Sequence, residues 1–220
     1  RRSTSWSVHL PFLWIDGSCV DENIRQASVK THLDFINTTR VLEPTHYVLH
    51  SITDMSIFRN SNISQDLREK YMVRVVDAAK RTAQQLVNVL KTPDQLCIEN
   101  LTEMDFRWDL EVVEESGAAI CLDIGHHFHR GGDPVVFLEE HFSRIKCIHA
   151  HNVVPTISEQ NAMQWKAVDH FGLHNGLIDI ERFLERLVDR QYSGALIAEV
   201  RGLAEGQPST EFLKRLGLFD

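Results

Sequence analysis

Short apolar segments alternate with longer helical patterns along the chain, and this alternation limits the folds open to it. Strands are expected at 6–10, 46–50, 96–99, 118–123, 145–149 and 194–200. Helices are expected at 21–40, 64–90, 106–116, 133–143, 179–191 and 210–216. A repeated strand–helix order predicts parallel strands joined by right-handed crossovers. Because the strands are almost wholly apolar, helices should cover both faces of the sheet. An open doubly wound sheet and a closed barrel both fit this pattern.

Local signals support several of these boundaries. Ser64 is a good N-cap residue, and acidic residues follow it in the first helical turn. Pro93 should stop the same helix, and Asp133-Pro134 should begin another one. Residues 153–176 show neither pattern, so we expect a long loop there that covers a functional site.

The composition is that of one soluble domain covering residues 1–220. The chain has 23 Lys and Arg against 31 Asp and Glu, a net charge of −8, which argues against nucleic acid as a partner. No apolar run is long enough for a membrane span, and no signal-peptide pattern is seen. We expect a cytoplasmic protein whose four cysteines are reduced and mostly buried.

Ionisable residues of metal-ligand type stand at the carboxyl ends of the expected strands. Parallel α/β folds place their sites at these ends, where loops and helix N-termini converge. Burying unpaired carboxylates is costly, and a shared cation would offset that cost. Carboxylate and imidazole together suit Zn, Mn, Fe or Co. The residues are His9, His50, Glu99, Asp123, His149 and Glu199.

Three strand cysteines support one register for these ligand candidates. Each cysteine lies two residues before a candidate, so both side chains face the same side of the strand. The wall of a barrel would show this arrangement on its inward face. Each strand would present a small buried residue in one layer and a metal ligand in the next layer toward its carboxyl end. A metal site made of the thiols themselves is the alternative, but no CxxC spacing supports it. The cysteines are Cys97, Cys121 and Cys147.

The most specific local signal is Asp123-Ile124-Gly125-His126. Gly125 allows a sharp turn, so that Asp123 and His126 can address one centre. The plain alternative is a strand that ends in a turn. Farther along, His149 and His151 fall on the same face of their strand, so either could bind the metal.

Other histidines and the tryptophans carry weaker signals. Asp169-His170 lies in the expected long loop, where His170 is either a site residue or an ordinary loop histidine. His127 and His129 are expected to be solvated or to support the ligands. The four tryptophans are expected to pack in the core or in loops, although Trp14 could line a ligand pocket. They are Trp6, Trp14, Trp108 and Trp165.

These residues resemble the xylose isomerase-like barrel superfamily, which includes sugar isomerases, epimerases and type IV apurinic endonucleases. The resemblance implies a (β/α) TIM-type barrel and a four-ligand metal site made by Glu99, Asp123, His149 and Glu199. His9, His50, His126 and His170 match positions that the endonuclease branch uses for further metals. The similar segments are His9-Leu10-Pro11-Phe12, Val48-Leu49-His50, Cys97-Ile98-Glu99-Asn100-Leu101, Leu122-Asp123-Ile124-Gly125-His126, Ile148-His149-Ala150-His151-Asn152, Asp169-His170 and Ala198-Glu199-Val200.

Within the superfamily the chain looks similar to the cobamide-remodelling phosphodiesterases, through His9-Leu10-Pro11 and Leu42-Glu43-Pro44 among other segments. Two features depart from the pattern. Val168 stands where an Asp often precedes the loop His by two residues, which argues against an endonuclease-type trinuclear site. Only six of the eight β/α units of a TIM barrel are visible, so we expect an N-terminally incomplete barrel, or one that a partner such as a second copy completes.

The leading hypothesis is metal-dependent phosphodiester hydrolysis, with a cobamide nucleotide loop as the expected small-molecule substrate. Here Glu99 or Glu199 would orient the attacking water. A second metal or the phosphate would be held by His9, His50, His126 and His170. The alternative is a divalent-metal sugar isomerase or epimerase, in which Glu99 and Glu199 exchange a proton with carbon. An apurinic endonuclease is disfavoured by the acidic charge. A non-catalytic corrinoid- or metal-binding remnant is the remaining hypothesis.

Overall fold

The computed structural model describes residues 5–53, 63–156 and 166–217. They form two compact units, Arg1–Cys121 and Leu122–Asp220, and each unit is described by itself. Trp165 and the middle of the expected 153–176 loop lie outside the described residues. Among the described helices, none combines the length and the apolar character needed to span a membrane.

The first unit is built on parallel strands, as the sequence predicts. Its hydrogen-bonded neighbours follow the order β1-β2-β3-β4. The register places Val48 of β2 beside Cys97 of β3, and Glu99 of β3 beside Cys121 of β4. The strands are β1 (Ser7–His9), β2 (His46–Leu49), β3 (Leu96–Glu99) and β4 (Ala119–Asp123).

The helices of the first unit begin and end close to the predicted positions. Ser64 caps α3 by accepting a hydrogen bond from the Leu67 N–H at 3.3 Å. Gly117 ends α4 with a φ of 73°, a left-handed conformation that glycine adopts without a Cβ clash. The helical segments are α1 (Glu22–Thr39), η1 (Arg40–Leu42), α3 (Gln65–Val87), η2 (Pro93–Gln95) and α4 (Arg107–Ser116).

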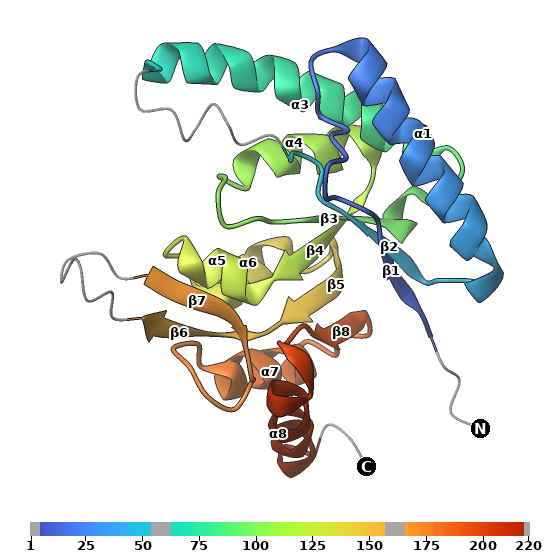
Figure 1. The fold of residues 1–220 in the computed structure, drawn as a ribbon. Coiled ribbons are helices and arrows are strands. Elements are labelled where there is room, and N and C mark those ends of the chain that lie inside the picture. The colour runs from blue at the N-terminus through green and yellow to red at the C-terminus, as the bar shows by residue number, and fades with distance from the viewer. Residues whose placement is uncertain (1–4, 54–62, 157–165, 218–220) are drawn as a thin grey trace. The chain divides into compact units, whose positions relative to one another are not determined.

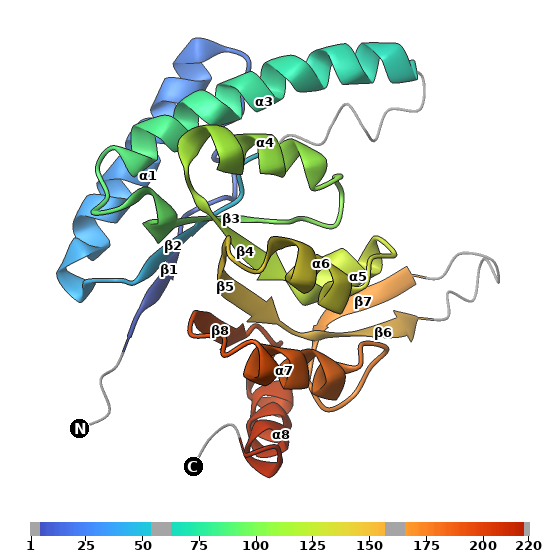
Figure 2. The ribbon, with the colours of Figure 1, turned by 180° about the vertical axis from the view of Figure 1, so that it is seen from behind.

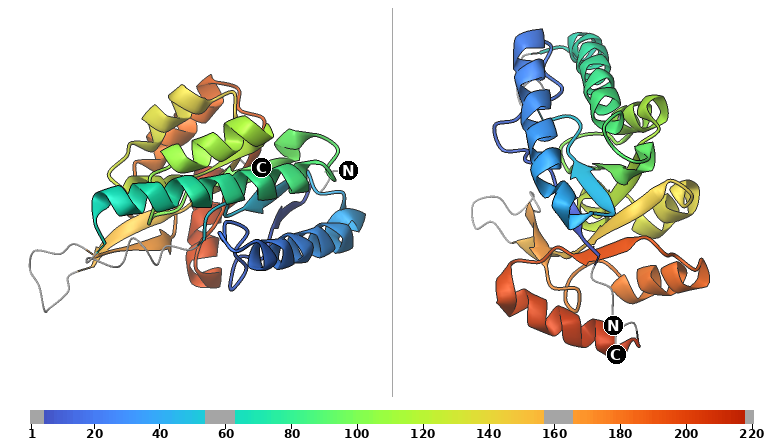
Figure 3. Two further views of the ribbon diagram at one scale, coloured as in Figure 1. Left: turned by 90° about the horizontal axis from the view of Figure 1, so that it is seen from above. Right: turned by 90° about the vertical axis from the view of Figure 1, so that its right-hand side faces the viewer.

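Helix packing in the first unit includes a buried arginine. Figures 1 and 3 show α3 running along both α1 and α4. Arg25 of α1 is only 2% exposed and donates to both carboxylate oxygens of Glu22, at 2.8 and 2.5 Å. It also donates to the Thr82 hydroxyl at 3.0 Å, and that hydroxyl donates to the Gly17 carbonyl. Arg25 therefore joins α1 to α3 through buried hydrogen bonds. At the surface, the same polar groups would bond to water instead.

The second unit pairs two strands in parallel and adds a hairpin. β5 lies beside β8, and β6 runs antiparallel to β7. Figure 2 shows α6 and α7 of this unit. Ion pairs from Arg182 to Asp133, the N-cap of α6, and from Arg186 to Glu139 join the two helices. The elements are α5 (Ile124–His129), α6 (Pro134–His141), β5 (Ile145–Ala150), β6 (Asn152–Thr156), β7 (Lys166–Phe171), α7 (Ile180–Asp189), β8 (Ala195–Ala198) and α8 (Gly202–Arg215).

Two predictions for this unit are wrong. The expected 153–176 loop contains the β6–β7 hairpin, whose strands were hidden by Pro155 and by charged residues that break a plain alternation. The last helix begins at Gly202 rather than at 210, because two glycines and Pro208 read as helix breakers although α8 continues through them. Ser209 donates to the Glu205 carbonyl within α8, which satisfies one backbone acceptor near the proline.

Candidate metal centre

In the first unit, three predicted site residues come together where β1, β2 and β3 end. Glu99 is 2% exposed, and its Oε2 lies 3.1 Å from His9 Nε2 and 3.2 Å from His50 Nε2. One donor atom from each residue lies within 4.8 Å of the others. Phe12 packs on both imidazoles, with ring centroids 5.2 Å from His9 and 4.5 Å from His50. The strand ends therefore converge within this unit as the sequence predicts.

A second buried carboxyl, Asp109 of α4, was not predicted as part of this region. Asp109 is 1% exposed and accepts a short hydrogen bond from the Ser51 hydroxyl, directly after His50. Burial raises the pKa of Asp109 to about 7, against the Ser51 hydrogen bond, which lowers it; the nearby Glu99 charge also raises it. Its helical sequence context gave no signal, because an Asp on a helix is usually solvated.

In the second unit, Asp123, His149 and Glu199 converge in the same way. One ligand atom from each lies within 4.8 Å of the others. His149 Nδ1 is 2.9 Å from Glu199 Oε2, and the Glu199 side chain is 36% exposed while His149 is nearly buried. The site is thus reachable from solvent mainly on its Glu199 side.

Three further histidines of the second unit, His126, His151 and His170, have ring nitrogens close to the Asp123 carboxylate. His151 Nε2 lies 3.0 Å from Asp123 Oδ1, and His126 Nδ1 lies 3.7 Å from Oδ2. Asp123 is also the N-cap of α5, where its Oδ1 accepts a hydrogen bond from the His126 backbone N–H at 2.7 Å. The His170 ring stacks on His151 with centroids 4.2 Å apart. Burial lowers the pKa of His151, but the hydrogen bond and charge of Asp123 outweigh it and raise that pKa above its ordinary value.

His170 is held in a strained backbone conformation by its neighbours. Its φ is 59°, which non-glycine residues rarely adopt. Its Nδ1 lies 2.9 Å from Asp169 Oδ1, and Arg201 donates to the same oxygen at 3.1 Å. Burial raises the pKa of Asp169, but the hydrogen bond and charge of His170 dominate and hold that pKa below its ordinary range. Arg201 was not predicted; its place two residues after Glu199 was the only signal.

The donor set of the second unit suits a divalent ion. Metal–ligand bonds of about 2.0–2.2 Å place the ligands of one ion roughly 4 Å or less apart, close to the spacing found here. Mixed imidazole and carboxylate donors favour Zn, Mn, Fe or Co. Asp123, His149 and Glu199 fit such an ion, and Asp123 is shared with the histidine group. A single centre that also includes Glu99 of the first unit stays a prediction.

Other sequence predictions have mixed outcomes. Cys97, Cys121 and Cys147 are fully buried, as predicted for strand residues. Trp14 was expected to pack in the core or a loop, or to line a ligand pocket, yet it is 99% exposed. Its φ of 65° belongs to a turn that carries the side chain into solvent. His129 is exposed, as predicted, while the His127 ring packs against Phe137.

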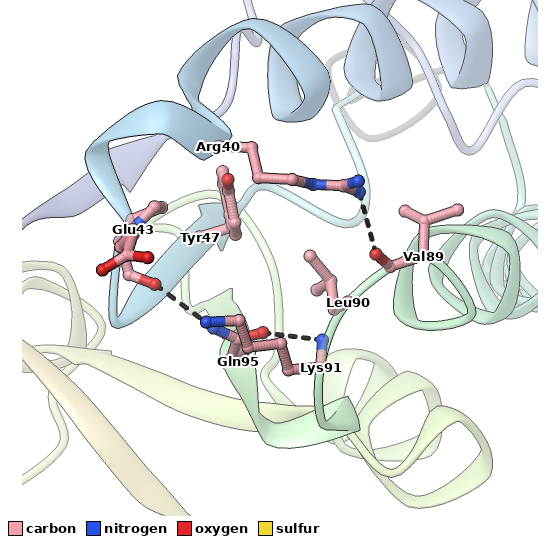
Figure 4. Close-up of a pocket in the computed structure, with 8 residues that line it drawn as sticks. Arg40, Glu43, Tyr47, Val89, Leu90, Lys91 and Gln95 are labelled. Atoms are coloured by element: carbon pink, nitrogen blue, oxygen red, sulfur yellow. Dashed lines mark hydrogen bonds between the residues drawn. The ribbon is translucent and has the colours of Figure 1, made fainter.

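A hollow of about 360 Å³ lies at the opposite ends of the first unit's strands (Figure 4). Arg40 donates to the Val89 carbonyl there at 3.1 Å, and Gln95 donates to the Pro44 carbonyl at 3.2 Å. These residues precede β2 and β3, whereas His50 and Glu99 stand at or just after the carboxyl ends. In parallel α/β barrels that amino-terminal face serves stability rather than chemistry.

Comparisons with known proteins agree with this architecture. Residues 3–216 match the family model of the xylose isomerase-like TIM barrel. A D-tagatose 3-epimerase-like protein is similar at 22% identity and a TM-score of 0.74, over 97% of this chain and 77% of that one. An L-ribulose 3-epimerase is 18% identical with a TM-score of 0.66, over 96% and 73%. A Thermus thermophilus protein soaked with ZnCl2 is 20% identical with a TM-score of 0.66, over 98% and 79%.

No curated protein matches the sequence significantly. The family match covers nearly the whole chain and confirms the predicted TIM-type barrel class over the open doubly wound sheet. At identities below 25% the solved structures support the fold alone. The likeness to cobamide-remodelling phosphodiesterases therefore stays a prediction.

Proposed function

Because the chain belongs to the xylose isomerase-like TIM barrel family, we propose that it is a divalent-metal enzyme that isomerises or epimerises a sugar. The observation that carries this proposal is the trio Asp123, His149 and Glu199, which gathers two carboxylates and an imidazole at strand ends. Two similar solved structures are named as 3-epimerases or 3-epimerase-like, and a third was soaked with ZnCl2. These names favour sugar chemistry over hydrolysis.

In this proposal Asp123, His149 and Glu199 hold the ion, with Glu99 as the fourth ligand that the family resemblance implies. A bound divalent ion polarises a carbonyl and its adjacent hydroxyl, which makes the neighbouring C–H more acidic. Glu199, the half-buried and most accessible member of the trio, would take a proton from that carbon. Glu99 would return a proton to the carbon, and His9 and His50 hold its carboxylate in place.

Proton exchange at carbon tests this proposal directly. Protein loaded with Mn²⁺ or Co²⁺ is incubated with D-tagatose or L-ribulose in D2O, and NMR follows deuterium at the carbon next to the carbonyl. We expect incorporation with the wild type and none above background with Glu199→Gln. Glu211→Gln, an exposed carboxylate on α8, is the matched control and should behave as the wild type. Metal-loaded protein that exchanges no deuterium into any ketose of a broad panel would contradict the proposal.

Phosphodiester hydrolysis remains a second candidate because of one observation, the histidine group around Asp123. His126 and His170 lie beside a carboxylate that the first ion would also use, and their rings are 5.5 Å apart. A second ion or a phosphoryl oxygen bound there would suit in-line displacement by water. The substrate implied by the sequence resemblance is a cobamide.

The two candidates differ in metal stoichiometry and in the bond that breaks. Elemental analysis should give one ion per chain for the isomerase and two for a two-metal hydrolase. Cleavage of bis(p-nitrophenyl) phosphate, lost in His126→Gln and His170→Gln but not in His129→Gln, would favour the hydrolase. Release of a phosphorylated corrinoid from a cobamide would then identify the substrate.

A further inference from the structure

We infer that His151 is a positioning residue that aligns the Asp123 carboxylate, and that it binds no metal itself. This role rests on the proposed metal site and deepens it. His151 is 0% exposed, and both of its ring nitrogens already have protein partners. The sequence alone places it on the same strand face as His149, where it looks equally suited to be a ligand.

The partners of the two nitrogens fix the tautomer of the ring. The His170 backbone N–H points at His151 Nδ1 from 2.9 Å, and the Asn152 carbonyl oxygen lies 3.2 Å from the same nitrogen. The closer contact, from a group that can only donate, makes Nδ1 an acceptor, and Nδ1 is occupied by a protein partner in either case. The proton of the neutral ring then sits on Nε2, which lies 3.0 Å from Asp123 Oδ1 and 3.1 Å from Oδ2. A nitrogen that donates to a carboxylate has no lone pair left for an ion. Neither nitrogen is therefore available as a ligand.

The ring is also fixed by its packing. A Cβ added at Gly125 would lie 1.9 Å from His151 Cε1, so the imidazole rests directly on the α5 backbone. The ring also stacks on His170, with an interplanar angle of 9°. The sharp turn predicted at Gly125 is wrong, because residues 124–129 form α5 and Gly125 has no positive φ; Gly125 is required for the space that it leaves.

The fixed His151 ring orients the Asp123 carboxylate. Its Oδ1 accepts the His126 N–H at 2.7 Å and lies beside the His151 Nε2–H. Two donors from different elements orient this carboxylate before any ion arrives. Partners of this kind typically change metal affinity about 10–100-fold when they are removed. Through the His170 N–H, the same ring also joins Asp123 to β7.

Cobalt binding separates a positioning residue from a ligand, because the Co²⁺ absorption spectrum reports the coordination shell. We expect His151→Leu to weaken the Co²⁺ Kd by about 10–100-fold while the band positions of the saturated protein stay those of the wild type. His151→Gln, which keeps an N–H near the Nε2 position, should recover part of that loss. His149→Gln, which removes a proposed ligand, should shift the bands, and the exposed His129→Gln should change neither quantity.

Gly125→Ala provides a second test that leaves every proposed ligand in place. The added methyl group must displace the His151 ring, so Co²⁺ affinity should fall as in His151→Leu, with unchanged bands. Circular dichroism of the metal-free variants establishes that each one folds, and Gly125→Ala and His151→Gln carry the test if His151→Leu does not.

Three results would overturn this role. His151 variants whose bands shift as in His149→Gln would make His151 a ligand. Folded His151→Leu and Gly125→Ala proteins that bind Co²⁺ as tightly as the wild type would show that Asp123 needs no alignment, while the proposed metal site survives. A wild-type protein that binds no Co²⁺ would remove the proposed metal site and this role together.

Discussion

Replacing the buried Asp109 by asparagine should make the protein more stable, and increasingly so as the pH rises. Asp109→Asn keeps an oxygen that can accept the Ser51 hydroxyl hydrogen bond and removes the charge. Burial raises the pKa of Asp109 from 3.8 to about 7, so the folded protein holds a proton that the unfolded chain releases between these two values. The folded state therefore loses stability in this window, because the unfolded chain can ionise the carboxyl and the folded chain keeps it protonated.

The magnitude follows from the two pKa values. The folded-state pKa lies above the unfolded one, so the contribution to stability is complete below pH 3.8 and is lost as the pH approaches about 7. Each pH unit in this window removes about 1.4 kcal/mol of unfolding free energy, or about 4 kcal/mol in total. Asparagine does not titrate, so the variant escapes this loss.

Urea unfolding of metal-free wild type and Asp109→Asn across this pH window measures the effect. All other titratable groups are the same in the two proteins, so their contributions cancel in the difference between the two unfolding free energies. It should grow in favour of the variant by several kcal/mol from pH 4 to pH 8. Asp105→Asn, at an exposed carboxylate just before α4, controls for the loss of a charge. A difference for Asp109→Asn that stays flat with pH would refute the reasoning.

Three further predictions concern stability and metal binding. Arg25→Met should lower the unfolding free energy by about 2 kcal/mol in urea, because the Thr82 hydroxyl loses a buried partner; an unchanged value would mean that Arg25 contributes packing alone. Ser64→Ala should cost about 1 kcal/mol in the same assay, through the lost α3 cap, and a neutral result would mean that water replaces it. Mn²⁺ should raise the melting temperature, EDTA should reverse the rise, and Asp123→Asn should abolish it; a rise that persists in Asp123→Asn would place the ion elsewhere.

The sequence predicts much of this structure because its signals are local. Parallel strands follow from strand–helix alternation, and the convergence of His9, His50 and Glu99 follows from their place at or just after strand ends. Helix starts at Ser64 and Asp133 follow from capping chemistry. Each inference needs only neighbouring residues and the geometry of parallel strands.

The sequence does not predict what depends on distant partners. His151 looks like a ligand until the backbone N–H of His170, nineteen positions away, is found on its Nδ1. Gly125 reads as a turn residue, although its missing side chain makes room for that ring. The β6–β7 hairpin is hidden for a similar reason, because its strands are recognised by pairing with each other rather than by their own composition.

Glu99 and Asp109 are two buried carboxyls of the first unit, and their neighbouring side chains suit them to different roles. Glu99 lies against two imidazoles that can carry positive charge, whereas Asp109 has a neutral hydroxyl and a pKa raised by burial to about 7. Glu99 is thus suited to serve as an anionic ligand, whereas Asp109 keeps its proton to a higher pH than an ordinary carboxyl does. Glu99→Gln should therefore abolish tight Mn²⁺ binding in isothermal titration calorimetry, whereas Asp109→Asn should leave the Kd within about threefold of the wild type, since RT ln 3 is only about 0.6 kcal/mol. An Asp109→Asn protein that loses Mn²⁺ as completely as Glu99→Gln would mean that both carboxyls act as anions, and the separation of roles would be wrong.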